Sequence, residues 1–407
     1  MRSSQAIGLS CSFLLGAAAV FAVTINVFGD LSHPTRITVE LLALIGLQAL
    51  RHLRFWVSRE LLLNFAFLGY ALLTLAWTDD INAAVATLPA MFNFILELLF
   101  FSSLIAYHDL RATLGGMFAG FLAAAAFYTL TEGFPFTYPE DFSYNTIAGM
   151  YLSGLFITMV NGAYRGWRLV PLALGAVFLT LIAATTSIKT NLGVWMGIFV
   201  SGMLYFRLSF RSAIRTLIVL ALLGTGMAYY VASNPALTER VQSGFARVSS
   251  GIAVLTNREN DTGSTGLGTR QGWQKEGLKG WAATPVFGHG VEAFRSDFGI
   301  TSHSTPIDLL YNAGMIGCGL FYAMLASIAW RLMQSRNRAW RSVRARISVC
   351  LIAYSFMSLS GILYYDPFVA IFISVSSGLL LRLEHAGQQS VRWVGAGREP
   401  DGPALRT

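Results

Sequence analysis

Apolar segments follow one another along this chain, separated for most of its length by short polar connections. A helix needs about 17 to 25 predominantly apolar residues to cross a hydrocarbon core about 30 Å thick. The sequence predicts twelve such spans, of which the second, sixth and eighth are short. They lie at residues 7–28, 35–50, 60–78, 85–106, 112–131, 145–161, 169–187, 191–206, 214–232, 306–330, 347–364 and 367–382.

Composition agrees with this pattern, because 54% of the residues are hydrophobic and only 12% are charged, against about 25% charged in soluble domains. We therefore expect an all-α polytopic membrane protein. The first apolar run is longer than the core of a signal peptide, and no small-residue cleavage site precedes a soluble domain. We interpret this segment as a retained helix.

Basic residues are distributed unevenly between alternate loops. With the N-terminus inside, the cytoplasmic loops and tail hold 20 of the 29 Lys and Arg residues. The short outer loops hold only Arg36 and Lys189, beside seven acidic residues: Asp30, Asp79, Asp80, Glu132, Glu140, Asp141 and Asp366. Because Lys and Arg accumulate on the cytoplasmic side of a membrane, twelve spans with both termini in the cytoplasm best preserve the alternation.

The net charge of +8 follows from this topological bias and from attraction to anionic lipid headgroups, so no nucleic-acid partner is expected. Cys11, Cys318 and Cys350 all fall inside apolar segments. Neither a disulfide framework nor a zinc cluster is therefore expected, and membrane lipids are the one partner that composition indicates.

One long polar stretch, residues 233–305, interrupts the apolar pattern after nine spans in residues 1–232. Three spans follow in residues 306–382, and residues 383–407 form a cytoplasmic tail. The alternation places the long stretch outside, which in a bacterial inner membrane is the periplasm. ATP is absent there, so a reaction would need an activated substrate delivered through the lipid.

Local patterns divide that outer loop into smaller elements. Residues 234–255 repeat apolar positions at helical spacing, which predicts an amphipathic helix. Residues 257–268 are polar and glycine-rich, as in a flexible connector. A short helix carrying Arg270 is expected to begin near residue 269, and residues 285–290 indicate a turn.

His303 lies just before a sequence typical of a helix start, with Thr305 as the N-cap, Pro306 in the first position and Asp308 in the third. The partial positive charge of a helix N-terminus favours neutral imidazole, the form that accepts a proton. The same helix end stabilises an anion. One small region is thus suited to hold both a phosphate group and a base.

Two cations are candidates for binding that phosphate group. Arg270 can pair with it bidentately, and Lys189 can add a charge from the very short outer loop 187–191. A cation between two apolar spans is costly unless an anion accompanies it. Simpler interpretations remain open, because His303 can be an ordinary interfacial group and Arg270 can pair with a surface acid, Glu276 or Asp297.

Other polar residues are weaker candidates. His289 lies between two glycines with neither a cation nor a helix start beside it. Glu40 and Glu97 fall inside apolar segments, where structural pairing is the simpler explanation. The acid pairs at 79–80 and 140–141 resemble divalent-metal ligands, but the topology already accounts for acids on that side. No metal or cofactor is expected.

Three motifs resemble those of the O-antigen ligase and polymerase superfamily. They are Arg270-x-x-Trp273, Pro285-x-x-Gly288-x-Gly290, and His303-Ser304 followed by Leu310, Gly314 and Gly317. Twelve spans with one large outer loop between the ninth and the tenth extend the resemblance over nearly the whole chain. The chain carries Lys189 where members commonly have Arg, and Ser304 where members often have Asn.

The resemblance implies a GT-C-like, metal-independent, inverting glycosyltransferase. Its donor would be a glycan on undecaprenyl pyrophosphate, with His303 as the catalytic base and Arg270 and Lys189 binding the pyrophosphate. An O-antigen ligase that uses a lipid A-core acceptor fits the single large loop and short tail best. An O-antigen polymerase and a protein O-oligosaccharyltransferase remain alternatives in the superfamily. A polyprenyl-linked glycan transporter, or flippase, is the alternative from another class, and the oligomeric state is left open.

Overall fold

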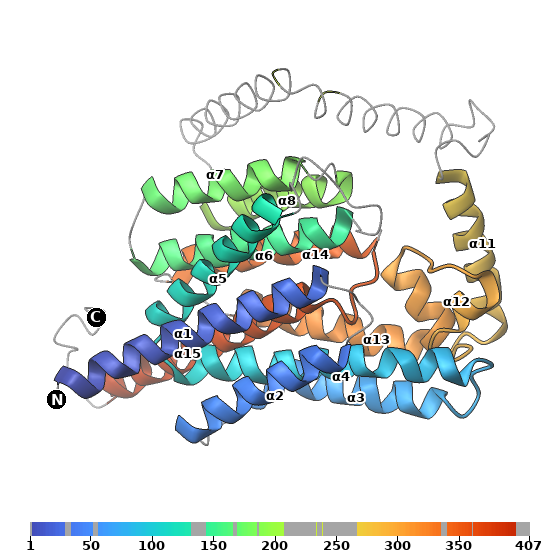
Figure 1. Ribbon diagram of the computed structural model, residues 1–407, viewed down its shortest axis with the longest axis horizontal. Coiled ribbons are helices and arrows are strands. Elements are labelled where there is room, and N and C mark those ends of the chain that lie inside the picture. The colour runs from blue at the N-terminus through green and yellow to red at the C-terminus, as the bar shows by residue number, and fades with distance from the viewer. Residues whose placement is uncertain are drawn as a thin grey trace.

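The computed structural model describes residues 2–28, 34–51, 56–131, 144–165, 169–184, 187–206, 233, 238, 267–334, 340–359 and 361–395. Within these residues the regular secondary structure is entirely helical (Figure 1). The helices are α1 (Arg2–Phe28), α2 (Pro34–Arg51), α3 (Arg59–Thr74), α4 (Ile81–Tyr107), α5 (Leu110–Thr131), α6 (Tyr144–Arg165), α7 (Leu169–Ala184), α8 (Ile188–Ser201), the π-helix η1 (Gly202–Phe206), α11 (Leu267–Ala283), α12 (Ala293–Phe298), α13 (Thr305–Gln334), α14 (Arg341–Ser358) and α15 (Pro367–Gly395).

Five of these helices are long and apolar enough to cross a membrane. The spans are Gly8–Ile25, Ile81–Tyr107, Leu110–Thr131, Thr305–Gln334 and Pro367–His385. The expectation of an all-α membrane protein is therefore confirmed. Helices lie at every other predicted span except 214–232, which is outside the described residues. The amphipathic helix expected over 234–255 is also outside them, apart from Thr238.

Glycines allow two pairs of helices to approach at backbone distance. A Cβ atom on Gly116 of α5 would lie 2.0 Å from the carbonyl oxygen of Phe13 in α1. On α8, a Cβ atom on Gly197 would lie 2.5 Å from the carbonyl oxygen of Val349 in α14. Small residues at such contacts provide the van der Waals packing that holds helices together in lipid.

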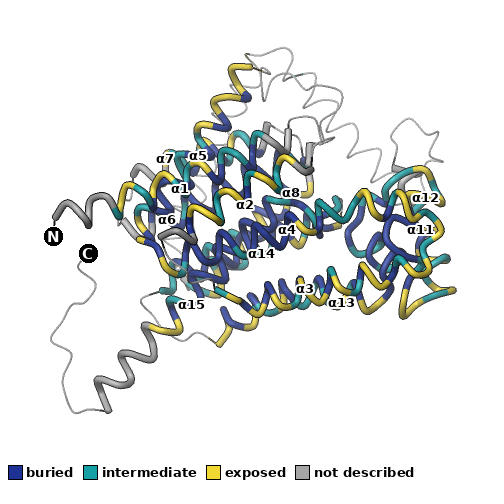
Figure 2. The backbone as a smooth tube through the Cα atoms, turned by 60° about the horizontal axis from the view of Figure 1, so that its bottom comes forward, coloured by how far each residue is buried: buried dark blue, intermediate teal, exposed yellow. Residues whose placement is uncertain are grey.

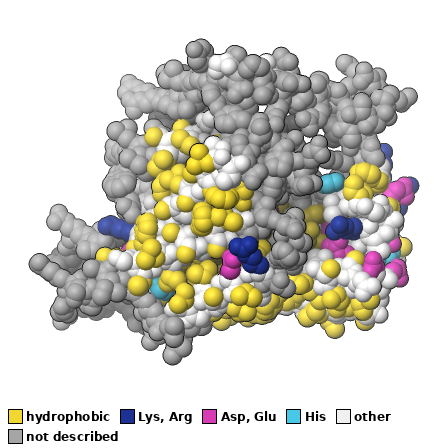
Figure 3. All heavy atoms as spheres, viewed as in Figure 1, with side chains coloured by type: hydrophobic (Ala, Val, Ile, Leu, Met, Phe, Trp, Pro, Cys, Tyr) yellow, Lys and Arg dark blue, Asp and Glu magenta, His cyan; other side chains and the backbone are white. Residues whose placement is uncertain are grey.

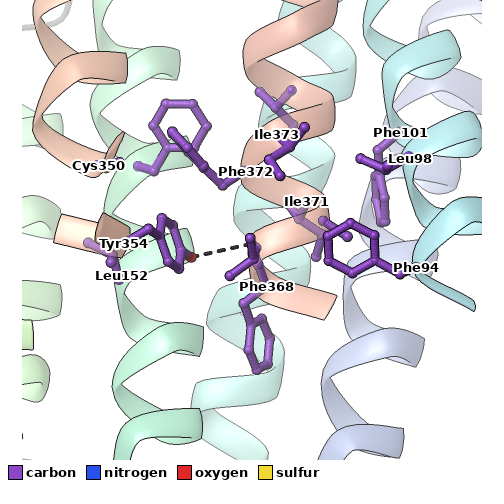
Figure 4. Close-up of a cluster of buried hydrophobic side chains, with 14 of the residues drawn as sticks. Phe94, Leu98, Phe101, Leu152, Cys350, Tyr354, Phe368, Ile371, Phe372 and Ile373 are labelled. Atoms are coloured by element: carbon purple, nitrogen blue, oxygen red, sulfur yellow. Dashed lines mark hydrogen bonds between the residues drawn. The ribbon is translucent and has the colours of Figure 1, made fainter. Parts of the chain in front are cut away.

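The Pro367–His385 part of α15 is mostly buried within the bundle (Figure 2). Its aromatic and branched side chains pack against Phe94 on α4 and Tyr354 on α14 (Figure 4). The Tyr354 hydroxyl donates to the carbonyl oxygen of Phe368, at 3.3 Å, and lies 2.5 Å from the hydroxyl of Ser153 on α6. These two buried hydroxyl groups are thus satisfied within the protein, as an apolar interior requires.

The bundle has two distinct ends. One end, which we call the loop end, carries α11 and α12 together with the connections 75–80, 284–304 and 359–366 (Figure 1). The other, which we call the terminal end, brings together the start of α1 and the last turns of α4 and α15. Here Ser12 lies 3.3 Å from the imidazole of His108, and Arg382 donates to the His108 carbonyl oxygen.

A buried charge network lies toward the terminal end. Arg331 of α13 lies 3.4 Å from Glu60 of α3 and 2.9 Å from Glu384 of α15. Glu60 also accepts hydrogen bonds of 2.8 Å from Ser327 and Ser377. Opposite charges and hydroxyl groups therefore compensate each other where water is excluded.

Candidate functional site

Helix α13 is broken near the loop end. Gly314 has φ 61° and ψ −164°, which interrupts the helical hydrogen bonds. The carbonyl oxygen of Tyr311 instead accepts the N–H of His289 at 2.9 Å, and that of Asn312 accepts the N–H of Gly290 at 2.8 Å. The turn expected at residues 285–290 is confirmed, and it supplies hydrogen bonds that the broken helix lacks.

The contact between this turn and the break in α13 is close. The N–H of Met315 donates to the carbonyl oxygen of Pro285 at 2.9 Å. A Cβ atom on Gly314 would lie 2.2 Å from the carbonyl oxygen of Val286. Only glycine combines the left-handed backbone with this approach. Two of the glycine motifs identified in the sequence are thus parts of one structural unit.

The residues after the turn are fixed to the last residue of α3 and to the α3–α4 connection. The N–H of Val291 donates to the Thr74 hydroxyl at 3.2 Å, and the Thr78 hydroxyl donates to the Val291 carbonyl oxygen at 3.1 Å. Next to this anchor, Glu292 is buried with φ 63°. Burial, followed by the charge of Asp308, raises the pKa of the Glu292 carboxyl group above its ordinary value.

His303 is half-buried and has φ 53°. In the described part of the chain, His303 and Glu292 are the two non-glycine residues with a positive φ. A tight turn surrounds His303, because the Ser302 hydroxyl donates to the Ser304 carbonyl oxygen at 2.9 Å and accepts the Ser304 N–H at 3.2 Å. Such an unfavourable conformation persists only where the surrounding structure holds it.

The prediction of Thr305 as the N-cap of α13 was wrong by one residue. The helix begins at Thr305, and the carbonyl oxygen of Ser304 accepts the N–H of Asp308 at 2.9 Å. The Thr305 hydroxyl is used elsewhere. It donates to the carbonyl oxygen of Gly361 at 2.5 Å and accepts the N–H of Leu363 at 3.0 Å. His303 still lies two residues before the helix.

Lys189, at the start of α8, contacts the same connection between α14 and α15. Its ammonium group donates to the carbonyl oxygen of Leu359 at 3.0 Å, and Leu359 is the C-cap of α14. A cation is favourable at a helix C-terminus. The structure therefore gives Lys189 a local partner, and it ties both Lys189 and Thr305 to residues 359–363.

Arg270 lies in the first turns of α11, which confirms the helix expected near residue 269. Its side chain is outside the described part of the structure. The second half of α11 packs on the start of α13, where a Cβ atom on Gly277 would lie 3.2 Å from Ile307 and one on Gly280 would lie 2.4 Å from Tyr311. Position 270 is two helical turns before Gly277.

Asp308 was considered in the sequence only as part of a helix start. In the structure it is buried and accepts hydrogen bonds from Tyr364 at 2.8 Å and from Asn312 at 2.9 Å. The ring of Tyr364 is buried as well. No local pattern links positions 308 and 364, since the contact depends on how α13 meets the α14–α15 connection.

Asp366 is a third buried acid at this end. Its carboxylate accepts the N–H groups of Phe368 at 2.8 Å and of Val369 at 3.3 Å, and so caps α15. Burial raises the pKa of Asp366 to about 7, although the two N–H groups act in the opposite direction. Acidic side chains also gather around α11 and α12 on the surface (Figure 3).

Several weaker candidates have structural partners. The imidazole of His289 lies 3.0 Å from the Gly280 carbonyl oxygen and stacks on Tyr311. Glu276 pairs with Lys279 at 2.6 Å, and Glu40 pairs with Arg36 at 3.1 Å. In the described residues, no group of three His, Cys, Asp or Glu side chains is arranged to hold a metal ion.

Asp297 and Asp80 are likewise accounted for locally. Asp297 accepts the hydroxyl of Tyr311 at 2.5 Å, and Asp80 caps α4 by accepting the N–H of Ala83 at 3.0 Å.

Comparison with known proteins adds no further assignment, because the chain matches no protein-family model and no curated protein significantly. The candidate site is therefore defined only by the residues of this chain and their contacts.

Proposed function

We propose that this protein is an O-antigen ligase of the bacterial inner membrane. It transfers a glycan from undecaprenyl pyrophosphate to a hydroxyl group of lipid A-core, without a metal ion. The observation that carries the proposal is the attachment of Lys189 and the His303 segment to one connection, residues 359–363. The motif resemblance supplies the reaction class.

The membrane arrangement in this proposal is twelve spans with a GT-C-like fold. The loop end faces the periplasm, and both termini are cytoplasmic. Support comes from the uneven distribution of basic residues in the sequence. It also comes from the described connections 75–80, 284–304 and 361–366, which lie at one end of the bundle (Figure 1). The lipid carrier then reaches the site from the outer leaflet.

In the proposed reaction, His303 accepts the proton of the acceptor hydroxyl group. The hydroxyl oxygen forms a bond to the anomeric carbon, and the bond from that carbon to the pyrophosphate oxygen breaks, with inversion. The electron pair leaves with the pyrophosphate, so negative charge grows on that group. Lys189 and Arg270 stabilise this charge, as preorganised cations do in group transfer.

Lys189 is suited to this role because it places a positive charge beside the α14–α15 connection. A hydrogen bond to the Leu359 carbonyl oxygen holds the ammonium group in place, and the side chain is exposed. A pyrophosphate brings opposite charge to this ammonium group, and hydrogen bonds between charged groups are stronger than those between neutral ones. Arg270 is placed in the proposal by the packing of α11 on α13.

Purified protein in lipid nanodiscs, supplied with a lipid-linked glycan and a lipid A-core acceptor, tests the proposal. We expect glycosylated acceptor to form without nucleotide and in the presence of EDTA. His289→Gln serves as the matched control for His303→Ala, since both histidines lie at the loop end. Carrier movement without a new glycosidic bond would instead identify a transporter. Glycan-to-glycan products would identify a polymerase, and glycosylated protein would identify an oligosaccharyltransferase.

A further inference from the structure

The carboxylate of Asp308 joins segments that are far apart in the sequence. Tyr364, on the α14–α15 connection, donates its hydroxyl group at 2.8 Å. The side-chain amide of Asn312 donates an N–H to Asp308 at 2.9 Å. The side-chain carbonyl oxygen of Asn312 accepts the N–H of Phe294 at 2.7 Å. The N–H of Asp308 also donates to the carbonyl oxygen of Ser304, directly after His303, at 2.9 Å. The His303 turn is therefore linked to the connection through one buried acid.

The α14–α15 connection also holds the other end of the candidate site. Leu359 accepts the ammonium group of Lys189, and two residues later Gly361 accepts both the hydroxyl group and the N–H of Thr305. Because this one short segment contacts both Lys189 and Thr305, a shift of the segment moves both candidate groups. The connection is itself fixed at its far end, where Asp366 caps α15.

We propose that Leu359 and residues 361–366 form a positioning bridge that sets the separation between Lys189 and His303, with Asp308 and Tyr364 as its positioning residues. This inference deepens the proposed function and rests on it. Neither positioning residue contacts substrate in the proposal. Tyr364 and Asp308 fix the bridge to α13, and the bridge aligns the base with the cation.

Alignment matters because transfer requires the base, the anomeric carbon and the leaving group to be in place together. A misplacement of about 1 Å in such a geometry lowers the rate about 100-fold. A hydrogen bond that merely stabilises the fold has no such effect on the turnover of the folded molecules. Positioning and stability are therefore separable by comparing kcat with the unfolding temperature.

The main test is Tyr364→Phe, which removes one hydroxyl group and keeps the buried ring. We expect kcat for glycan transfer to fall about 10-fold, with KM for the acceptor unchanged. The matched control is Tyr128→Phe, because Tyr128 is also buried and donates to a carbonyl oxygen, that of Ile25, at 3.0 Å. Equal losses of kcat in the two variants would overturn the inference.

A double-mutant cycle tests the link to Lys189. If the bridge aligns Lys189 with the base, Tyr364→Phe loses most of its effect on kcat once Lys189→Ala is present. In the same background, Tyr128→Phe keeps whatever effect it had. Full additivity of Tyr364→Phe with Lys189→Ala would show that the bridge does not couple the two groups.

A third measurement reads the position of His303 without any transfer reaction. Diethyl pyrocarbonate modifies neutral imidazole, and peptide mass spectrometry follows residue 303 separately. We expect Tyr364→Phe and Asp308→Ala to raise its modification rate, and Tyr128→Phe to leave it unchanged. An unchanged rate in the first two variants contradicts the bridge. If wild-type protein transfers no glycan although these rates change, the proposed function fails and the positioning bridge stands.

Discussion

The two ends of the bundle treat buried charge differently. At the terminal end, Arg331 lies between Glu60 and Glu384, so each buried charge has an opposite charge nearby. At the loop end, the buried acids Asp308 and Asp366 are held by hydroxyl, amide and N–H groups. At the terminal end Arg331 is thus ion-paired within the protein, whereas at the loop end the cation Lys189 is exposed at the surface.

This difference indicates a division of roles. A buried ion pair that is complete within the protein contributes to the structure of the fold and has no capacity left for a ligand. Acids held by neutral donors fix the backbone of the loop end, where Lys189 is exposed at the surface. The comparison therefore predicts that substitutions at the loop end change activity, and substitutions at the terminal end change stability.

His303→Ala gives the largest expected effect. Removing a general base lowers the rate about 100-fold to 10,000-fold, and the half-buried ring contributes little to the fold. Transfer measured in nanodiscs should fall by this factor, while the unfolding temperature stays close to that of wild type. Wild-type turnover in this variant would remove His303 as the base and would make the two ends functionally equivalent.

Arg331→Met tests the opposite end. Loss of the guanidinium group leaves Glu60 buried without its cation, which costs about 3 to 5 kcal/mol. Unfolding of detergent-solubilised protein by SDS should therefore require less denaturant, while the kcat of the folded fraction is unchanged. Arg36→Met is the control, because the exposed Arg36–Glu40 pair should contribute less than about 1 kcal/mol. Equal stability losses would show that burial does not distinguish the two pairs.

Gly314→Ala disturbs the contact between the 285–290 turn and the break in α13 at the loop end. The substitution forces a side chain into a left-handed backbone and against the Val286 carbonyl oxygen, at a cost of about 1 to 3 kcal/mol. We expect lower stability together with lower transfer, because the 285–290 turn must move. Gly319→Ala on the same helix has open space around its Cβ and should be tolerated. A harmless Gly314→Ala would contradict the broken helix.

Asp366→Asn differs from the other variants because its effect is expressed through the pH dependence of stability. The folded pKa of about 7 is above the ordinary value of 3.8, so the folded state binds the proton more tightly. Stability should therefore fall as pH rises from about 4 to 7, by at most about 1.4 kcal/mol per pH unit from this group. The Asn variant keeps an oxygen for capping α15 and should lose this dependence. Identical pH profiles of the unfolding temperature would contradict the raised pKa.

The helices were the most predictable feature of this protein, because apolar length alone identifies them. The turn at residues 285–290 and the helix containing Arg270 also followed from local sequence. The partners of the site residues did not. Lys189 contacts a carbonyl oxygen 170 residues away, and Asp308 contacts Tyr364 from another helix connection. Such contacts depend on how helices pack, and no local pattern encodes them.

A structure of the protein with undecaprenyl pyrophosphate bound, determined by cryo-electron microscopy in nanodiscs, is the most direct test of the central claim. We expect the pyrophosphate between the side chains of Lys189 and Arg270 at the loop end, with the His303 imidazole facing the adjacent space for an acceptor hydroxyl group. Pyrophosphate bound at the terminal end, or a His303 side chain remote from both cations, would contradict the account.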